Sequence, residues 1–396
     1  MIKHKLPKGF LANGIYCGVK KKRKDLSLIC SEKLCKVAAV FTSNVVKAAP
    51  VIMAQRQLKK NGLVKAIVIN SGNANCMTGR QGLKDAREIA SRMAKLIKAK
   101  ADQVLTSSTG IIGELMPMKP MIKGMPKLVN GLSKNGLLEA AEGIMTTDSF
   151  SKISSRTFTL GGKKIRITGI AKGAGMIDPS MATMLCYIMT DVNISKKFLQ
   201  EALSASNEIS FNAITVDGDM STNDTVMLLA NGEAGNKLID GNSSEFKVFQ
   251  DNLNGVCSDL AKMVVRDGEG ASKFIEVNVK GAKNDKDAKQ MADAIAGSLL
   301  VKCAVLGGDP NWGRIASSAG SSGVKFNPEK IEIALDGVTF FKNGKAQAHV
   351  NRKSSSVFKK KDVKIEVNVH SGKGKAIAYS CDISKKYITL NSYYTT

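Results

Sequence analysis

A strand, a polar loop and an amphipathic helix in succession form the pattern that most limits how this chain can fold. The run Leu63–Ile69 is apolar and rich in β-branched side chains, which is typical of a buried strand. The loop Asn70–Gly79, NSGNANCMTG, follows directly. Apolar residues then recur at three- and four-residue spacing, as on one face of a helix: Leu83, Ala86, Ala90, Met93 and Ile97. The pattern predicts an α/β unit whose loop lies at a strand end, either as a plain turn or as a binding loop.

A second strand end carries a denser group of hydroxyls. The segment Val104–Gly113, VLTSSTGIIG, reads as a short strand that ends in a run of Ser and Thr residues. The step from Thr109 to Gly110 can direct a hydroxyl and backbone N–H groups at one point, which is what an oxyanion hole requires. Local hydrogen bonds between hydroxyls and the backbone of a turn explain the same residues when the segment is considered alone.

The stretch Lys172–Leu185, KGAGMIDPSMATML, places a single hydroxyl in an apolar run. Two glycines, Gly173 and Gly175, allow backbone conformations with φ > 0, and Asp178-Pro179-Ser180 favours an extended or turning chain. The hydroxyl belongs to Thr183. It is either a buried threonine bonded to a neighbouring carbonyl or a nucleophile at the end of a glycine-shaped loop, and this stretch alone does not choose.

The remaining patterns predict an α/β (α+β) protein with mixed sheets, helices outside and two interlocked halves. Residues 1–60 read as short strands and turns, and the last quarter of the chain reads as β-rich. Further helices are expected over Gly136–Ile144, from a cap at Ser195, over Glu245–Val265 and over Lys286–Val301. Further strands are expected over Val37–Thr42, Ile165–Ile170, Phe274–Val279 and Ile331–Leu335, and as a hairpin of Ile365–Val369 with Ile377–Cys381 through Gly372–Gly374.

The net charge of +25 calls for an anionic partner or a lysine-rich background. The runs Lys20–Lys24 and Lys359–Lys361 are the best local signals for nucleic acid. However, only ten of the 59 basic residues are arginine and the aromatic fraction is 5%. Nucleic-acid readers concentrate arginine and interleave aromatics, so anionic small substrates fit the composition better.

Cysteine and histidine usage narrows the chemistry. The eight cysteines are scattered without a CxxC pair, which favours reduced thiols in the cytoplasm over disulfides or structural zinc. Three histidines, His4, His349 and His370, argue against a histidine metal site or a Ser-His-Asp triad. The acidic loop Asp217–Thr225 lacks EF-hand spacing and is expected to be a hydrogen-bonded turn. No apolar run has the length of a membrane span, and no secretory signal begins the chain.

Taken together and in order, the loops resemble those of the ornithine acetyltransferase family, the glutamate N-acetyltransferases of arginine biosynthesis. The resemblance extends from about residue 5 to the last residue. This sequence departs from the family pattern at Ala174, Asp178 and Ser180. The matching motifs are NSGNANCMTG, SSTGIIGE, MTTDS, GIAKGAGMIDPSMATML, TVDGDMSTNDT, RDGEGASK, GGDPNWGR and NSYYTT.

The resemblance implies a self-processing architecture similar to that of N-terminal nucleophile (Ntn) hydrolases. The chain would cut itself between Ala182 and Thr183, giving segments 1–182 and 183–396 that form one interlocked unit. The freed α-amine, with an unperturbed pKa of about 7.7–8.0, would then serve as the base for the Thr183 hydroxyl on the same residue. This scheme needs no histidine, which suits a chain that has three.

The family's activity implies a ping-pong transfer of acetyl from N2-acetylornithine to glutamate through acetyl-Thr183. No metal or cofactor is expected, acetyl-CoA stays open as a second donor, and the cleaved chains are expected to form a heterotetramer without nucleic acid or membrane. An Ntn-type amidase that hydrolyses N-acetylated amino acids is the alternative. By resemblance, Thr109 and Gly110 form the oxyanion hole, and the substrate is bound by Thr146, Thr147, Lys172, Thr183, Glu269, Asn391 and Thr396.

Overall fold

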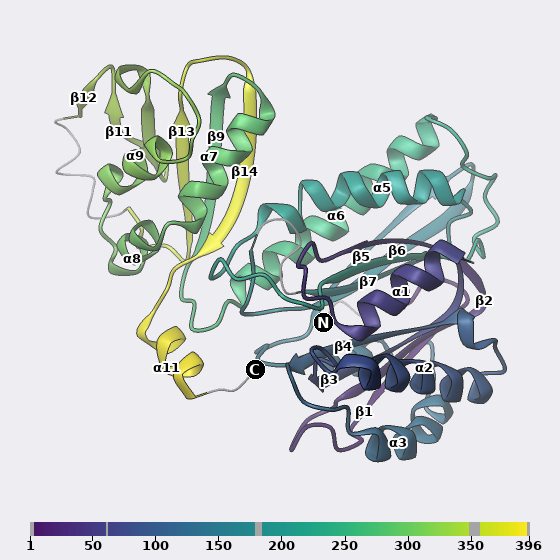
Figure 1. The fold of residues 1–396 in the computed structure, drawn as a ribbon. Coiled ribbons are helices and arrows are strands. Elements are labelled where there is room, and N and C mark those ends of the chain that lie inside the picture. The colour runs from purple at the N-terminus through teal and green to yellow at the C-terminus, as the bar shows by residue number, and fades with distance from the viewer. Residues whose placement is uncertain (1–3, 61, 179–183, 348–356, 394–396) are drawn as a thin grey trace.

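The computed structural model describes residues 4–60, 62–178, 184–347 and 357–393 (Figure 1). Its larger part is built on an eight-stranded mixed sheet in which β3 and β4, and likewise β7 and β8, run parallel. The strand order is β4-β3-β2-β8-β7-β6-β5, and β1 pairs with β2. The strands are β1 (Phe10–Ile15), β2 (Leu26–Phe41), β3 (Leu63–Asn73), β4 (Val104–Ile111), β5 (Lys152–Leu160), β6 (Lys163–Lys172), β7 (Leu185–Thr190) and β8 (Thr225–Ala230).

A smaller lobe contains the second sheet, of six strands in the order β12-β11-β10-β13-β9-β14. In Figure 1 it stands apart from the large sheet and is joined to it through α6 and the end of β14. Its strands are β9 (Phe274–Ala282), β10 (Glu332–Leu335), β11 (Val338–Lys342), β12 (Lys345–Ala346), β13 (Asp362–Asn368) and β14 (Gly374–Cys381).

The helices cover both sheets. Six accompany the large sheet: α1 (Ala49–Lys60), α2 (Gly79–Leu96), α3 (Met118–Asn130), α4 (Leu137–Gly143), α5 (Lys196–Glu208) and α6 (Ser244–Arg266). Of the helices in the described residues, three pack on the small sheet: α7 (Asp285–Gly297), α8 (Leu299–Gly307) and α9 (Trp312–Gly320). The helix α11 (Lys385–Tyr393) returns from β14 toward the large sheet (Figure 1), and 3₁₀ turns lie at Ala101–Gln103, Phe211–Ala213 and Pro328–Lys330.

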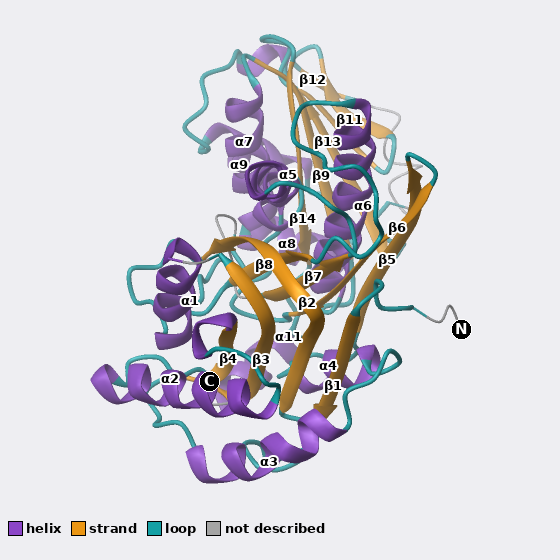
Figure 2. Ribbon diagram, turned by 90° about the vertical axis from the view of Figure 1, so that its right-hand side faces the viewer, coloured by secondary structure: helices purple, strands orange, loops and turns teal. Residues whose placement is uncertain are grey.

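The alternation of side chains along the strands divides the large lobe into separate cores. On β7, Cys186 and Ile188 pack with α5 and α6, whereas Tyr187 and Met189 face the opposite core, to which α4 contributes. All of these side chains are buried, as expected when each face of a sheet is covered by helices. Figure 2 shows α5 and α6 on one side of the sheet and α4 on the other.

The two predicted halves share the large sheet. Strands β1 to β6 precede residue 183, and β7 and β8 follow it. The two later strands are inserted between earlier ones, because β8 pairs with β2 and β7 pairs with β6. The predicted fold class, mixed α/β with two interlocked halves, is therefore confirmed.

One predicted strand pairing is wrong. The strands β13 and β14 do not form a hairpin, because β9 lies between them, parallel to β13 and antiparallel to β14. Their short connection crosses the end of β9, where Ser371 and Gly372 donate backbone hydrogen bonds to Gly281 O. A Cβ on Gly372 would lie 2.6 Å from Ala282 O, so this glycine serves a close crossing rather than a hairpin turn.

Two helix predictions also need correction. Residues 1–60 include the helix α1, which begins at Ala49-Pro50, and not strands and turns alone. Proline in the first helical turn is a recognised start signal. The helix expected over Lys286–Val301 is two helices, α7 and α8, separated at Ser298. The Ser298 side chain accepts a hydrogen bond from Val301 N and so begins a new helix.

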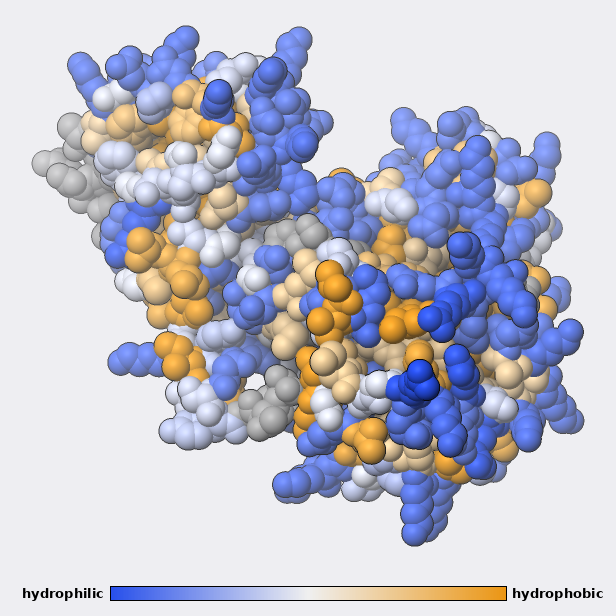
Figure 3. Space-filling view, viewed as in Figure 1, coloured by the Kyte–Doolittle hydropathy of each residue, from blue (hydrophilic) through white to orange (hydrophobic). Residues whose placement is uncertain are grey.

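Within the described residues, no single helix has the length and apolar composition of a membrane span. The helices α7 and α8 reach both only as a pair, with a bend of 57° between them. Most of the face shown in Figure 3 is hydrophilic, and apolar side chains are grouped in smaller areas.

Candidate active site

A pocket lies where loops from both halves of the large sheet meet the C-terminal helix. Hydroxyls, amides and two charged side chains dominate its lining. The pocket is lined by Ala74, Thr109, Gly110, Ile112, Thr146, Thr147, Lys172, Gly175, Met176, Ser221, Thr222, Asn223, Glu269 and Asn391.

The end of β4 approaches β3 so closely that it excludes a side chain. Gly110 has φ +136°, and a Cβ built on it would lie 2.3 Å from the carbonyl carbon of Gly72. Beside it, Thr109 is buried and Ser108 Oγ donates to Asn70 Oδ1 at 2.6 Å. Glycine at position 110 thus allows two polar strand ends to lie side by side at the pocket wall.

Asn223 connects this wall to the loop before β8. Its side chain is buried, and Nδ2 donates to Ala74 O at 2.7 Å and to Ser108 O at 2.8 Å. One amide group therefore satisfies a carbonyl of the loop after β3 and a carbonyl of β4 itself. Removing it would leave two buried acceptors without these bonds.

The last residue of β6, Lys172, brings a buried ammonium to the pocket. Its side chain is 3% exposed, and Nζ donates to Thr109 Oγ1 over a long 3.4 Å. Burial lowers the pKa of Lys172, and the nearby carboxylates of Asp148, Asp224 and Glu269 oppose that decrease. An ammonium has three donors, so Lys172 can bind an anionic group of a ligand.

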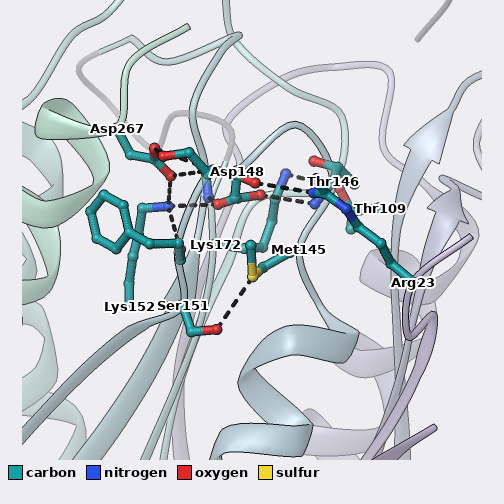
Figure 4. A network of polar contacts seen from close by, with 12 residues as sticks. Arg23, Thr109, Met145, Thr146, Asp148, Ser151, Lys152, Lys172 and Asp267 are labelled. Carbon is teal, nitrogen blue, oxygen red and sulfur yellow. Dashed lines mark hydrogen bonds and ion pairs between the residues drawn. The ribbon is translucent and has the colours of Figure 1, made fainter. Parts of the chain in front are cut away.

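Asp148 positions the segments on either side of Lys172. Its carboxylate accepts from Thr146 N at 2.8 Å, Gly173 N at 2.7 Å and Lys152 Nζ at 2.7 Å (Figure 4). Burial opposes ionisation, but Lys152, Lys172 and the Gly173 amide outweigh it and lower the pKa of Asp148 to about 2. The Asp148 carboxylate is therefore ionised at neutral pH.

Lys152 joins Asp148 to the second half of the chain. Its fully buried ammonium lies between Asp148 and Asp267, which follows α6 (Figure 4). Asp267 also accepts from Ser149 N at 3.0 Å. The loop after α4 and the loop after α6, which contribute Thr146 and Glu269 to the pocket, are thus fixed to each other by a buried ion triad.

Glu269 supplies a negative charge opposite Lys172. Its backbone N–H donates to Ala174 O at 2.8 Å, and its carboxylate accepts from Asn391 Nδ2 on α11 at 2.8 Å. The carboxylate packs on Gly175, where a Cβ would lie 2.6 Å from it. The second glycine of the Lys172–Leu185 stretch therefore makes room for Glu269, whereas the first, Gly173, has φ +152°.

The acidic loop before β8 binds backbone amides. Asp217 accepts from Met176 N at 2.6 Å and Ile177 N at 2.7 Å, and Asp224 accepts from Met184 N at 2.9 Å. The two carboxylates thus fix the chain before and after the undescribed residues 179–183. In the described residues, no group of three or more His, Cys, Asp or Glu side chains is arranged to hold a metal ion.

The structure brings seven of the nine predicted site residues together: Thr109, Gly110, Thr146, Thr147, Lys172, Glu269 and Asn391 all line the pocket. The other two, Thr183 and Thr396, lie outside the described residues. Sequence reasoning did not single out the supporting residues Asp148, Lys152 and Asn223. Asp148 and Asn223 do occur in motifs that were noted, MTTD and DGDMSTNDT, so clustering with hydroxyls could have identified them.

A polar pocket of hydroxyls, side-chain amides and one buried cation at strand ends defines a protein equipped to bind a small charged ligand. The model of the ArgJ family matches residues 11–396. The chain belongs to the ArgJ family, which confirms the resemblance noted in the sequence.

Two similar proteins cover all or nearly all of the chain. The arginine biosynthesis bifunctional protein ArgJ of Caldanaerobacter subterraneus subsp. tengcongensis is 45% identical over 398 residues, which are 100% of this chain and 98% of that protein. The protein of the same name from Geobacter sulfurreducens is 46% identical over 98% of this chain and 99% of its own. The crystal structure of ArgJ from Bacillus halodurans, 42% identical, covers 52% of this chain and 98% of that chain with a TM-score of 0.51.

Proposed function

We propose that this chain is a glutamate N-acetyltransferase of arginine biosynthesis that moves acetyl from N2-acetylornithine to glutamate. The observation that carries the proposal is the meeting of Lys172, Glu269 and the Thr109–Gly110 strand end in one pocket. A cation and an anion facing one cavity suit N2-acetylornithine, which has an α-carboxylate and a side-chain ammonium. Family membership supports the same assignment.

In the first half-reaction, the Thr183 hydroxyl attacks the acetyl carbon of N2-acetylornithine. The C–N bond breaks, the ornithine amine takes the hydroxyl proton, and acetyl stays on Thr183. Lys172 would hold the α-carboxylate and Glu269, aided by Asn391, the δ-ammonium. The oxygen that becomes negative would lie at Thr109 and Gly110, where one lost donor typically costs roughly 10²–10³ in rate.

In the second half-reaction, the amine of glutamate attacks the acetyl carbon. The C–O bond to Thr183 breaks, the new C–N bond forms, and the proton returns to the hydroxyl. Thr146 and Thr147 are proposed substrate contacts in both steps, with Thr396 at the C-terminus.

The same threonine is proposed to cut the chain after Ala182, leaving an N-terminal amine as its base. The pairing of β6 with β7 supports a cut after which the two segments stay together. Lys172 and Leu185, on either side of the cut, are partners in the β6–β7 register. We further propose that the cleaved chains assemble as a heterotetramer in the cytoplasm, without a bound cofactor, and that acetyl-CoA serves as a second donor.

Replacing Thr183 tests both roles at once. We expect Thr183→Ala to remain a single chain and to lose acetyl transfer, whereas wild type gives segments 1–182 and 183–396 by intact mass spectrometry. Thr159→Ala, at an exposed position of β5, is the matched control and should be cut and active. Full activity in uncut protein would contradict the proposal, and release of acetate without glutamate would favour the amidase instead.

A further inference from the structure

The connection between β1 and β2 contains the basic run Lys20–Lys24, and the acetylornithine reaction gives it no role. This connection is rigidly built. The carboxylate of Asp25, which is fully buried, accepts from the backbone N–H groups of Cys17, Gly18, Val19 and Lys20 at 2.7–3.0 Å. Four amides on one buried carboxylate fix the path of the chain that leads into the run.

The run lies beside the pocket. Lys20 Nζ donates to Met145 O at 2.9 Å, and Arg23 Nη1 donates to Asp148 O at 3.4 Å (Figure 4). Arg23 also lines a hollow with Leu390. That hollow shares Thr146, Thr147, Glu269 and Asn391 with the central pocket, so the two form a continuous surface.

Three cations of the run are available to a ligand. Lys20 points inward, and Lys24 pairs with Glu142 at 2.8 Å. Lys21, Lys22 and Arg23 are exposed, and none of them pairs with a carboxylate within the described residues. Lys172 already offers a cation to one substrate carboxylate. Three further positive charges at the entrance suit a ligand with several negative charges, as phosphate groups provide.

We propose that Lys21, Lys22 and Arg23 form a subsite for the phosphates of a coenzyme A thioester whose acyl end reaches the central pocket. The inference rests on the proposed function, because the acyl group must meet Thr183. There the C–S bond breaks as the bond to the Thr183 oxygen forms, and the thiol leaves with the hydroxyl proton. Glutamate then takes the acetyl group as in the reaction above.

The test compares two donors in one variant. Lys21→Gln/Lys22→Gln should raise the KM for acetyl-CoA about tenfold at low ionic strength, since it removes two of the three exposed charges of the subsite. Transfer from N2-acetylornithine should change less than about twofold, and the KM difference should shrink as salt screens the charges. The matched control is Lys163→Gln/Lys164→Gln, exposed and at the far end of β6 from Lys172, which should leave both donors unchanged.

Binding of fragments of coenzyme A distinguishes recognition of its phosphates from a general attraction of anions. By calorimetry, coenzyme A should bind wild type more tightly than dephospho-coenzyme A, and pantetheine should bind most weakly. The differences among these three affinities should be smaller in the Lys21→Gln/Lys22→Gln variant. Failure of wild type to bind coenzyme A or to use acetyl-CoA would overturn the subsite while leaving acetylornithine transfer intact. Equal losses of transfer from both donors in the variant would overturn the subsite as well. So would inhibition of acetyl-CoA-dependent transfer by inorganic phosphate or a short DNA duplex at the concentration at which coenzyme A inhibits it.

Discussion

At the residue scale, the pocket depends on positions that tolerate neither an added side-chain atom nor the loss of a charge. Gly110 lies against the backbone of Gly72, and Lys152 lies fully buried between two carboxylates. Substitutions at these two positions therefore separate loss of catalytic geometry from loss of stability.

Gly110→Ala should remove most acetyl transfer, by about a hundredfold or more, because its Cβ would collide with Gly72 and shift the proposed oxyanion donors. Gly113→Ala is the control. Gly113 has φ +89° but no heavy atom within 4 Å of a built Cβ. The Gly113→Ala variant should therefore lose about 1–2 kcal/mol of stability through backbone strain alone and keep its activity. Steady-state rates and urea unfolding of both variants measure the difference.

Lys152→Met should lower the free energy of unfolding by about 3–5 kcal/mol, because it leaves Asp148 and Asp267 buried without their cation. Arg156→Met removes the partner of Asp259 at a partly exposed pair and should cost less than about 1 kcal/mol. Chemical denaturation at neutral pH compares them. Equal losses would show that the buried triad contributes no more than a surface pair.

At the scale of elements, α11 is a helix held by its polar contacts. None of its residues is buried, and its anchors include Tyr387 Oη to Asp217 at 3.2 Å, Ser384 Oγ to Gly270 O at 2.7 Å and Asn391 to Glu269. Most helices in proteins are stabilised by burying an apolar face. This one instead closes the pocket by bonds to residues that line or support it.

Asn391→Ala should raise the KM for N2-acetylornithine about tenfold, since it removes the amide that orients the Glu269 carboxylate, and should change kcat little. Asn252→Ala is the control, because among the described residues that half-buried side chain on α6 donates only to the carbonyl of Val248 in its own helix. A fall in kcat with unchanged KM would place Asn391 in the chemical step and contradict a role in binding.

Local patterns predict most elements, whereas the wrong pairing of β13 with β14 has a nonlocal cause. The spacing of Leu83 to Ile97 specifies α2 on its own, and the serine cap at Ser195 specifies the start of α5. The placing of β9 between β13 and β14 depends on a partner 80 or more residues away, which no turn signal reports. The order of the motifs indicated which residues line the polar pocket. No local feature of the sequence indicates that Lys152 and Asp267 form an ion pair.

At the scale of the whole molecule, the proposed cut divides a single sheet. Strands β7 and β8 pair with each other, and together they lie between two strands from before residue 183, because β8 pairs with β2 and β7 pairs with β6. Each is also buried along its length. The two products are therefore expected to stay together until the sheet itself unfolds.

This arrangement predicts a concentration effect on stability. The denaturation midpoint of the cleaved protein should rise with protein concentration, because unfolding separates two chains and refolding must bring them together. The uncut Thr183→Ala protein should show a weaker dependence under the same conditions, because its unfolding separates only assembled copies and not the two segments of one copy. Circular dichroism over a hundredfold range of concentration measures both, and a constant midpoint for the cleaved form would contradict a division within the sheet.

The insertion of β7 and β8 also matters while the protein is being made. A ribosome delivers β2 and β6 before either of the strands that belong between them, so the nascent sheet has two open edges until about residue 230 has emerged. Unpaired strand edges are templates for aggregation. A gene split at codon 183 would prolong that state until two separate chains met, which gives a physical reason for one reading frame to encode both segments.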